Sequence, residues 1–502
     1  MTHTQNTLRT IRLLTVAMLL SISLIFIPAP GTQVAAQLED IPDRDITLAL
    51  QGQLLDDEIV SGHLIDVEVT NGIVTLSGTV DHLLAQARAV KLAESMKGVR
   101  SVIDQLTVRP VARSDEQIRK DVLSALALDP ATESYEIAVT VNLAVVTLEG
   151  TVDAWAEKEL AAQVVKGVEG VQEIFNNIEI EQPPARPDNE IQPEIERRFE
   201  LNPYVDETLI DVQVEDGHVT LTGTVGSVAE KTEAYTDAWV TGVKTVDDSE
   251  LQVEWWAREE TRRKEAPVIQ SDEAIRNAVN DALFYDPRVS SFEIGVSVES
   301  GEVTLTGIVT NLKARRVAEE DAEQTAGVWR VKNFIRVRPE SPPTDAQIAQ
   351  SVREALRWDP LVERDDITVK VFNKKAYLHG IVDTATEKWQ AEDVVSRVNG
   401  VVDVQNFLKI NTEWTWKTDR AIKEDIGDEY FWSLFVDGDA VDVTVEEGVA
   451  TLKGTVDSWS EYNAAVENAF EGGATAVESH LNVEGSPNTY PTYYESRPSY
   501  YW

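Results

Sequence analysis

Few residues of this 502-residue chain combine the types and the spacing that chemistry requires. Asp437, Asp439 and Asp442 lie close together in the sequence, and carboxylate oxygens of this kind bind Ca²⁺. The segment lacks the spacing and the terminal glutamate of an EF-hand loop, which favours a polar connection between a helix and a strand. The six histidines are far apart, and neither an HExxH motif nor a phosphate-binding loop is present. We therefore expect no catalytic centre, no metal site and no cofactor.

Aromatic side chains form the second group of candidates, and their chemistry is binding. Trp255, Trp256, Trp414 and Trp416 fall between predicted domains, where large apolar groups either pack neighbouring domains together or contact a partner. Domain packing is the interpretation that the pattern favours. A C-terminal tail, residues 485–502, adds aromatic residues without a helical or strand period: Tyr490, Tyr493, Tyr494, Tyr500, Tyr501 and Trp502. Because Tyr and Trp favour interfaces, we expect this tail either to be disordered or to dock on a partner or a membrane boundary.

The elements that must position these residues recur six times. In each copy an isoleucine within a helix-like stretch is followed 32 positions later by a glycine. The pairs are Ile46/Gly78, Ile118/Gly150, Ile191/Gly223, Ile275/Gly307, Ile348/Gly380 and Ile422/Gly454. Successive glycines are 72, 73, 84, 73 and 74 residues apart, so the chain is an array of six modules. Such an array favours repeated binding surfaces over a single buried active site.

Each module has the pattern helix, strand, strand, helix, strand. Capping residues such as Ser114 begin the first helix, and Asp-Pro or Asn-Pro stops it in modules 2 to 5. Modules 1 and 6 lack that proline, which leaves the ends of their first helices open. Alternating β-branched residues such as Ile65, Val67 and Val69 predict a strand with one buried face. A hairpin turn, a second strand that ends at the repeated glycine, an alanine-rich helix with a Gly-Val stop and a last strand complete the module.

The pattern predicts an α+β fold in which each module is a three-stranded mixed sheet with two helices on one face. The repeated glycines are therefore interpreted as structural. Ala144 and Lys374 replace the turn glycine of modules 2 and 5, which predicts a different turn geometry there. An apolar residue five positions after each repeated glycine predicts core packing rather than ligand binding: Leu83, Trp155, Val228, Leu312, Ala385 and Trp459.

These residues together resemble the BON-domain family. The resemblance rests on the alternating valine strand, on the hairpin of residues 71–80 and on the Gly-Val pair, and it extends over most of residues 42–484. It implies a non-enzymatic protein that binds phospholipid or other envelope components and assists folding in the periplasm. We expect a signal peptide at 1–36, modules at 42–110, 113–182, 187–254, 271–338, 343–411 and 417–484, a charged linker at 255–270 and the tail at 485–502.

The N-terminus and the charge indicate an exported protein. Arg9 and Arg12 precede an apolar run, Leu13 to Ile27, that is too short to span a bilayer, and small residues follow before Gln37. A cleaved signal peptide is favoured over a retained membrane anchor, so we do not expect an integral membrane protein. The chain has no cysteine, which excludes disulfides and an N-terminal lipid anchor. A net charge of −42 opposes binding to nucleic acid.

Two functions of different classes follow. The first is a periplasmic or secreted adaptor or chaperone-like scaffold, whose linked modules bind or protect envelope components during envelope or osmotic stress. The alternative is a phospholipid-binding protein of the periplasm or outer membrane. Local function is expected where the copies differ, namely at the turns of modules 2 and 5, at the first-helix ends of modules 1 and 6, and at the joint after module 3.

Overall fold

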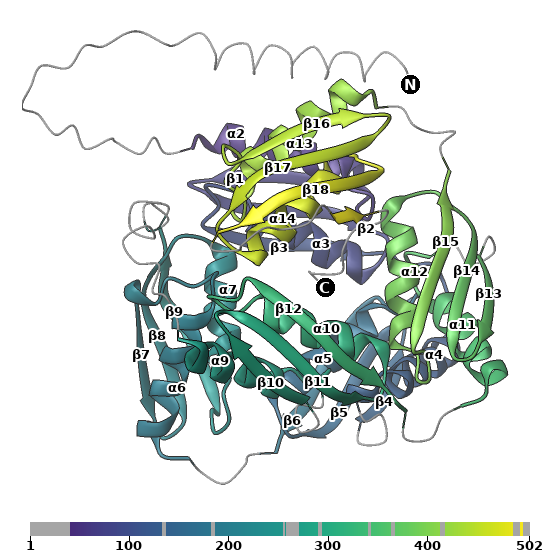
Figure 1. Cartoon of the computed structure of the whole chain (residues 1–502), viewed down its shortest axis with the longest axis horizontal. Helices are drawn as coiled ribbons and strands as arrows, with labels where there is room; N and C mark the ends of the chain where they lie inside the picture. Colours follow the sequence, from purple (N-terminus) through teal and green to yellow (C-terminus); the bar gives the residue numbers. More distant parts are fainter. Residues whose placement is uncertain are drawn as a thin grey trace, which may run out of the picture. The chain divides into compact units, whose positions relative to one another are not determined.

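The computed structural model describes residues 41–132, 137–181, 186–254, 257, 271–289, 294–339, 343–362, 367–411, 417–484 and 492–494, all within one compact unit, Ile41–Trp502. Six αββαβ modules follow one another in this unit, as the sequence pattern predicts (Figure 1). The predicted signal peptide lies outside the described residues. The same is true of other candidates from the sequence: Trp255, Trp256, Trp414, Trp416, Tyr490, Tyr500, Tyr501 and Trp502.

The first helix has the same length in every module and begins at an aspartate. The bounds are Asp43–Asp56 (α2), Asp115–Leu128 (α4), Asp188–Leu201 (α6), Asp272–Tyr285 (α9), Asp345–Trp358 (α11) and Asp419–Trp432 (α13). Ser114 and Thr344 form complete capping boxes. The helices of modules 1 and 6 end at the equivalent position without the proline. Their next residues, Asp57 and Ser433, accept a hydrogen bond from the N–H two residues on, which closes a turn.

Each sheet has its second strand in the centre. The first strands are Ile65–Thr70 (β1), Ile137–Asn142 (β4), Ile210–Glu215 (β7), Ile294–Glu299 (β10), Ile367–Phe372 (β13) and Val441–Glu446 (β16). The central strands are Ile73–Val80 (β2), Val145–Val152 (β5), His218–Val225 (β8), Glu302–Val309 (β11), Lys375–Val382 (β14) and Val449–Val456 (β17). The central strand runs antiparallel to the first, with Ile65 opposite Gly78, and parallel to the third, with Gly78 opposite Leu106.

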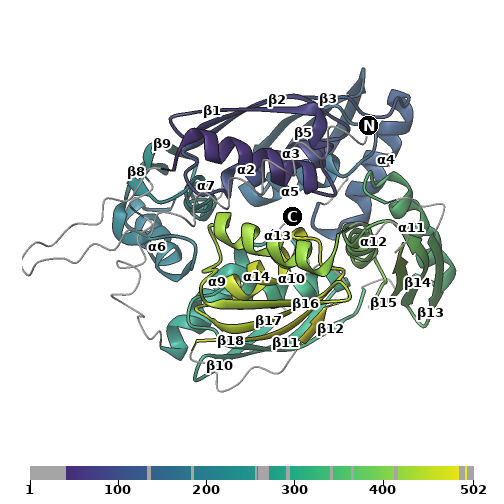
Figure 2. The same cartoon turned by 90° about the horizontal axis from the view of Figure 1, so that it is seen from above.

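The second helix connects the two parallel strands. These helices are Leu83–Glu94 (α3), Trp155–Lys166 (α5), Val228–Asp237 (α7), Leu312–Glu323 (α10), Ala385–Arg397 (α12) and Trp459–Glu471 (α14). The third strands are Ser101–Val108 (β3), Glu173–Ile180 (β6), Thr245–Val253 (β9), Arg330–Val337 (β12), Asp403–Ile410 (β15) and Ala476–Val483 (β18). Short 3₁₀ turns occur at Gly62–Leu64 (η1), Pro130–Thr132 (η2) and Glu207–Leu209 (η3). Both helices of module 1 lie on one face of its sheet, below it in Figure 2, so the predicted two-layer module is confirmed.

The repeated glycine occupies one position of the sheet in every module and adopts a backbone conformation that favours glycine. It lies opposite the residue that begins the first strand, as Ile137 does in module 2, Ile294 in module 4 and Ile367 in module 5. All six have a positive φ: Gly78 at 118°, Gly150 at 148°, Gly223 at 115°, Gly307 at 137°, Gly380 at 151° and Gly454 at 149°. Residues with a side chain rarely adopt such φ values, so the backbone itself calls for glycine here.

Close approach of the neighbouring strand adds a second reason for glycine. A Cβ placed on Gly78 would lie 2.1 Å from the carbonyl oxygen of Leu64. Gly223 and Gly454 have the same problem, with 2.2 and 2.0 Å to the carbonyl oxygen of the residue before the first strand. Any side chain at this position would push the end of the central strand away from the start of the first strand. These contacts support the interpretation of the repeated glycines as structural residues.

The hairpin turns of modules 2 and 5 have the same geometry as the others, so the prediction of a different turn is wrong. Leu143 and Ala144 have φ of 51° and 63°, close to the 53° and 74° of Asn71 and Gly72. The aspartate that begins the first helix explains this, because its carboxylate accepts hydrogen bonds from both turn N–H groups. In module 2 the Asp115 oxygens lie 3.0 and 2.9 Å from these two nitrogens.

This aspartate clamp recurs in all six modules. The acceptors and turn residues are Asp43 with Asn71 and Gly72, Asp115 with Leu143 and Ala144, Asp188 with Asp216 and Gly217, Asp272 with Ser300 and Gly301, Asp345 with Asn373 and Lys374, and Asp419 with Glu447 and Gly448. In modules 2 and 5, whose turns lack a glycine, these two hydrogen bonds hold the turn residues in the left-handed conformation. For Asp272 they also hold the pKa of the carboxyl below its usual value.

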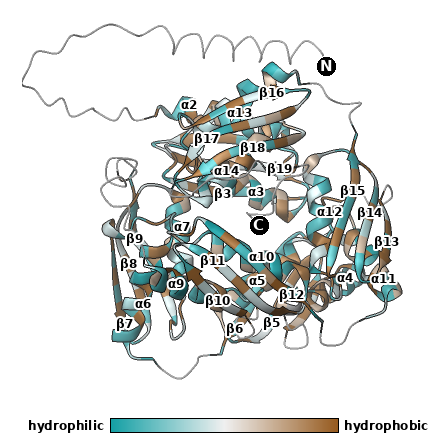
Figure 3. Ribbon diagram, viewed as in Figure 1, coloured by the Kyte–Doolittle hydropathy of each residue, from teal (hydrophilic) through white to brown (hydrophobic). Residues whose placement is uncertain are grey.

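The hydrophobic core is not confined to single modules. Hydrophobic and hydrophilic residues alternate along the strands (Figure 3), and the buried positions of β1 and β2 are apolar. Modules 3, 4 and 6 each contain a core of mainly their own residues. The cores of modules 1, 2 and 5 form one continuous cluster, with Leu50, Val122 and Val352 all fully buried in it. Modules distant in sequence are therefore packed together through apolar contacts.

Candidate functional site

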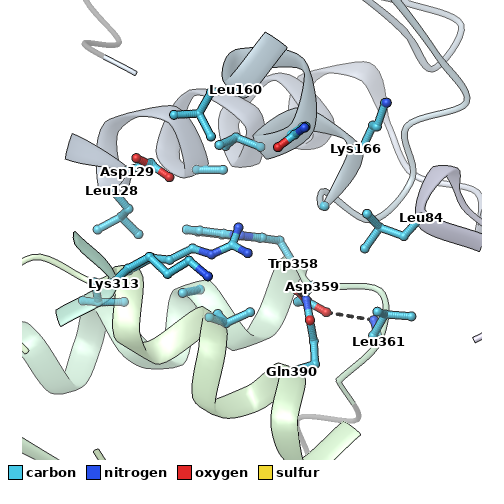
Figure 4. Close-up of a pocket in the computed structure, with 18 of the residues that line it drawn as sticks. Leu84, Leu128, Asp129, Leu160, Lys166, Lys313, Trp358, Asp359, Leu361 and Gln390 are labelled. Atoms are coloured by element: carbon cyan, nitrogen blue, oxygen red, sulfur yellow. Dashed lines mark hydrogen bonds between the residues drawn. The ribbon is translucent and has the colours of Figure 1, made fainter. Parts of the chain in front are cut away.

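A cavity of about 260 Å³ lies where helices of modules 1, 2, 4 and 5 meet (Figure 4). We call it the interhelical cavity. Much of its lining is apolar: Leu84, Ala87, Ala125, Leu128, Leu160, Val164, Ala355, Trp358, Leu361, Val394 and Val398. A concave, mainly apolar surface with a few polar groups is the usual form of a small-molecule site.

Helical periodicity brings the apolar lining to this cavity. In α5, Ala161 and Val165 are fully buried, while Leu160 and Val164, one position earlier in each turn, line the cavity. Trp358 is the last residue of α11 and is 6% exposed. Its carbonyl oxygen accepts a hydrogen bond of 2.7 Å from the N–H of Glu169, which ties module 5 to module 2 beside the cavity.

Five basic side chains also line the cavity, in a chain whose net charge is −42: Lys91, Lys166, Arg288, Lys313 and Arg397. Lys313 and Arg397 converge on Asp393, whose Oδ1 is 2.9 Å from Lys313 Nζ and whose Oδ2 is 2.9 Å from Arg397 Nε. Burial opposes the charge of Asp393, but the two cations outweigh it and hold its pKa below the usual range. Because Asp393 is ionised, it fixes both basic side chains at the cavity wall.

Two carboxyl groups, Asp129 and Asp359, face these cations. They are equivalent residues of modules 2 and 5, each following the first helix. Asp359 accepts hydrogen bonds from the N–H of Leu361 at 2.9 Å and from Gln390 Nε2 at 2.7 Å (Figure 4). Burial raises the pKa of Asp359 to about 6 and also raises that of Asp129. The cavity lining thus combines five basic groups with two carboxyl groups that are protonated more easily than usual.

The composition of the lining indicates which ligands the cavity could bind. Three of the basic groups are already paired, Lys313 and Arg397 with Asp393 and Arg288 with Asp286. An apolar wall that also carries basic groups matches a ligand that has an apolar body and an anionic group. In the described part of the chain, no three His, Asp or Glu side chains are grouped so that they could hold a metal ion.

The other candidate residues lie elsewhere. Asp437 and Asp439 fall between α13 and β16, where Asp437 accepts a hydrogen bond from the N–H of Asp439. Trp155 stacks on Trp239 of module 3 with ring centres 5.5 Å apart, so it packs two modules together. Trp459 contacts Tyr462 of its own helix at 4.8 Å. Neither tryptophan lines the interhelical cavity.

The repeated glycines are also separate from the cavity. They belong to the central strands of the sheets, whereas the cavity is lined by helices and by the segments that follow them. The glycines concerned, none of which is part of the described lining, are Gly78, Gly150, Gly223, Gly307, Gly380 and Gly454. Their role is therefore in the fold of each module and not in this candidate site.

Part of the C-terminal tail forms a strand that the sequence did not predict. Thr492–Tyr494 (β19) pairs antiparallel with β18, with Tyr494 opposite Val477. The Tyr494 hydroxyl lies 3.5 Å from that of Tyr462, and burial raises the pKa of Tyr494. The tail therefore docks on module 6 at this point. Whether Tyr493 and Tyr494 also bind a partner stays a prediction.

No helix in the part of the chain that the structure describes has both the length and the apolarity of a membrane span. The sequence pattern assigned none of the cavity residues to a site, and Asp129 and Asp359 were identified only as part of the stop signal of the first helix. The residues of α3, α5, α10 and α12 were missed as a site because they come from four modules. The one sequence signal for these residues is that several of them are basic in a chain that is otherwise strongly acidic.

The match to a sequence family agrees with the architecture of six modules. Six segments match the sequence model of the family described as "BON domain": residues 42–110, 114–182, 187–254, 271–339, 344–412 and 418–485. Over 143 residues the chain is 31% identical to "Osmotically-inducible protein Y" of Escherichia coli (strain K12), which covers 27% of this chain and 71% of that protein. A solved structure of CdsD, a structural protein of the type III secretion system of Chlamydia trachomatis, matches at 17% identity over 45% of this chain and 94% of that one, with a TM-score of 0.13.

Proposed function

This chain belongs to the BON-domain family, and from that premise we propose that it is an exported, non-catalytic binding protein of the cell envelope. Its ligand would be an anionic amphiphile of the phospholipid class, held in the interhelical cavity. The observation that carries this proposal is the cavity lining, which places five basic groups around an apolar wall in a strongly acidic protein. The acidic surface outside the cavity repels anionic ligands, so the cavity is the place where such a ligand would bind.

The size of the cavity restricts the ligand. Binding sites for drug-sized molecules usually have volumes of roughly 300–1,000 Å³, and 260 Å³ lies just below that range. A whole two-chain phospholipid is too large, so the cavity suits a single-chain amphiphile or one chain end and its charged group. The basic groups would attract the anionic group, while Leu160, Val164 and Trp358 would contact the apolar chain.

A scaffold that binds through six separate weak sites is the alternative, and it is supported by the six copies and by the relative described as osmotically inducible. The packing of the modules favours binding in a cavity between modules over this alternative. Helix faces that would have to bind six partners independently are buried against other modules, as in the shared core of modules 1, 2 and 5. Multivalent binding needs exposed, equivalent sites.

Native mass spectrometry with lysophosphatidylglycerol tests the ligand class, at concentrations below micelle formation. We expect one anionic lipid bound per chain, and weaker binding of lysophosphatidylcholine of equal chain length, because its head group has no net charge. Lys166→Glu should weaken binding of the anionic lipid by at least tenfold. Lys158→Glu is the matched control, since Lys158 lies on the same helix but does not line the cavity. Equal binding of both lipids, or of both variants, would contradict the proposal.

Export requires a separate experiment. Expression of the full chain in a Gram-negative host should give a mature protein in the periplasmic fraction whose first residue is Gln37. A chain that keeps residues 1–36 and sediments with membranes would show a retained anchor instead. Vesicle flotation of the mature protein, with and without anionic lipid, then separates a soluble lipid carrier from a membrane-bound one.

A further inference from the structure

We propose that residues 41–254 and 271–484 are two complementary halves that bind each other through three related interfaces, and that this association does not depend on the covalent link between them. Module 1 pairs with module 6, module 2 with module 5, and module 3 with module 4. The chain would therefore behave as a nested heterodimer of two three-module halves. The proposal concerns how the halves recognise each other and is independent of the ligand proposed above.

One backbone hydrogen bond recurs in all three pairs. The donor is the N–H of the residue before the glycine that follows the second helix, and the acceptor is the carbonyl oxygen of the last residue of the partner's first helix. The three bonds are Lys97 to Trp432 at 3.2 Å, Glu169 to Trp358 at 2.7 Å and Ala326 to Leu201 at 3.1 Å. The same two positions therefore meet in each pair, which indicates one docking geometry used three times.

The two modules of a pair differ at two further positions. Modules 2, 3 and 6 have a basic residue before the first helix and an acidic residue eight positions later: Arg113 and Asp121, Arg186 and Glu194, Lys417 and Asp425. Their partners, modules 5, 4 and 1, have uncharged residues at both positions: Pro343 and Ser351, Gln270 and Ala278, Ile41 and Ala49. Every pair thus combines one module that has charged residues at these two sequence positions with one module that has uncharged residues there.

The basic residue makes two contacts within its own module. Its side chain reaches the carbonyl oxygen of the residue before the glycine: Arg113 to Glu169 at 2.9 Å, Arg186 to Thr241 at 3.0 Å and Lys417 to Gly472 at 3.5 Å. It also pairs with the acidic residue of the first helix. The cation therefore connects the first helix of its own module to the loop that follows the second helix of that module.

The partner module contributes a side chain from the last turn of its first helix. Arg357 of module 5 donates to Asp121 of module 2 at 3.1 Å. In the pair of modules 3 and 4 the equivalent contact is made by the Tyr285 hydroxyl, which donates to Glu194. In modules 1 and 6 the charges are exchanged, because the partner contributes an acid: Asp56 Oδ2 lies 3.6 Å from Lys417 Nζ. The three interfaces thus share a geometry but differ in chemistry.

Additional contacts cross between the halves. Arg88 of module 1, which is 4% exposed, forms ion pairs with Asp57 and with Glu471 of module 6. Arg197 pairs with Asp281 at 2.8 Å between modules 3 and 4. The continuous core of modules 1, 2 and 5 also crosses the boundary. Separation of the halves would break the ion pair of Arg88 with Glu471, whereas the pair with Asp57 would stay within module 1.

The sequence supplies a natural place to cut. The repeated glycines of modules 3 and 4 are 84 residues apart, against 72 to 74 elsewhere, and the additional residues fall in the linker 255–270. A linker raises the effective concentration of the joined halves but adds no contact of its own. Association after the cut therefore measures the interfaces alone.

The test uses the full mature chain with a specific protease site placed in the linker. After complete cleavage, judged on a denaturing gel, size-exclusion chromatography at about 1 µM should return one 1:1 complex at the elution volume of the intact chain. Two separate peaks, or aggregates in place of the 1:1 complex, would overturn the proposal.

A charge-reversed variant tests the pairing itself. Arg357→Glu places a carboxylate against Asp121 and should weaken association of the cleaved halves by about tenfold, with a larger effect at low salt. The Arg357 side chain is 44% exposed, so the intact variant should still fold, which circular dichroism checks. Arg353→Glu, one turn earlier, is the matched control because Arg353 donates to the carbonyl of Val369 within its own module. Equal dissociation constants for the two variants would refute a role for this contact.

Discussion

The aspartate clamp should matter most where the hairpin turn has no glycine. Replacing Asp115 by Ala removes two hydrogen bonds of 3.0 and 2.9 Å to the turn of module 2. At about 1 kcal/mol each, and with about 0.5 kcal/mol for the lost negative charge at the helix N-terminus, the change costs module 2 about 2–3 kcal/mol. In module 1 the turn residues Asn71 and Gly72 favour this turn by themselves, so Asp43→Ala should cost less.

Hydrogen exchange of one amide beside each turn is a suitable local assay, because six modules need not unfold together. The Gln172 N–H donates to the Ala144 carbonyl oxygen at 2.9 Å, and the Arg100 N–H donates to that of Gly72 at 2.8 Å. Asp115→Ala should accelerate exchange at Gln172 by roughly 30-fold or more, since about 1.4 kcal/mol corresponds to a factor of ten.

Two controls decide the interpretation. Glu116→Ala changes the neighbouring first-turn acid, whose side chain forms an exposed ion pair with Arg119. It should accelerate exchange at Gln172 by no more than about twofold, which is the effect of one lost charge at the helix N-terminus. Adding Ala144→Gly to Asp115→Ala should recover about 1 kcal/mol, since glycine adopts the left-handed conformation without the Cβ penalty. The reasoning is refuted if Asp115→Ala and Asp43→Ala accelerate exchange equally, or if Ala144→Gly recovers nothing.

Two further substitutions test packing and protonation. Gly78→Ala should unfold module 1 locally and expose it to limited proteolysis, whereas Gly427→Ala, where an added Cβ meets no atom within 4 Å, should not. Because burial raises the pKa of Asp359 to about 6, above its unfolded value near 3.8, its contribution to stability is fully present below pH 3.8 and is lost as pH rises through 6. Asp359→Asn should therefore match the parent protein in denaturant unfolding at pH 4 and exceed it by up to about 3 kcal/mol at pH 8, and equal stability at both pH values would contradict this.

The fold of one module could be predicted from the sequence because its determinants are local. Alternating valines, caps and the repeated glycine specify elements within about 35 residues of each other, and six copies reinforce the pattern. The turns of modules 2 and 5 were predicted wrongly because the residue that forms the turn, Asp115 or Asp345, lies 28 positions before it. A carboxylate that compensates for a missing glycine leaves no signal in the turn itself.

The cavity could not be predicted, because its lining comes from modules that are distant in the sequence. Asp129 and Asp359 were recognised as helix stops, which they are, since each closes a turn with the N–H two residues on. Their place beside Lys313 and Arg397 depends on which modules pair, and a pattern that treats the copies as equivalent contains no information on pairing.

Differences among the copies, rather than their shared pattern, therefore carry what is specific to this chain, although not at the places that a comparison of turns and helix ends suggests. The first-helix ends of modules 1 and 6 and the turns of modules 2 and 5 preserve the common geometry through hydrogen bonds that the other modules also make. The informative departures are single positions on helix surfaces. Arg113 against Pro343, or Asp121 against Ser351, adds or removes contacts within a module but leaves its order of elements unchanged. Such positions decide which module faces which, and the modules that face one another enclose five basic groups around an apolar wall that no single module could build.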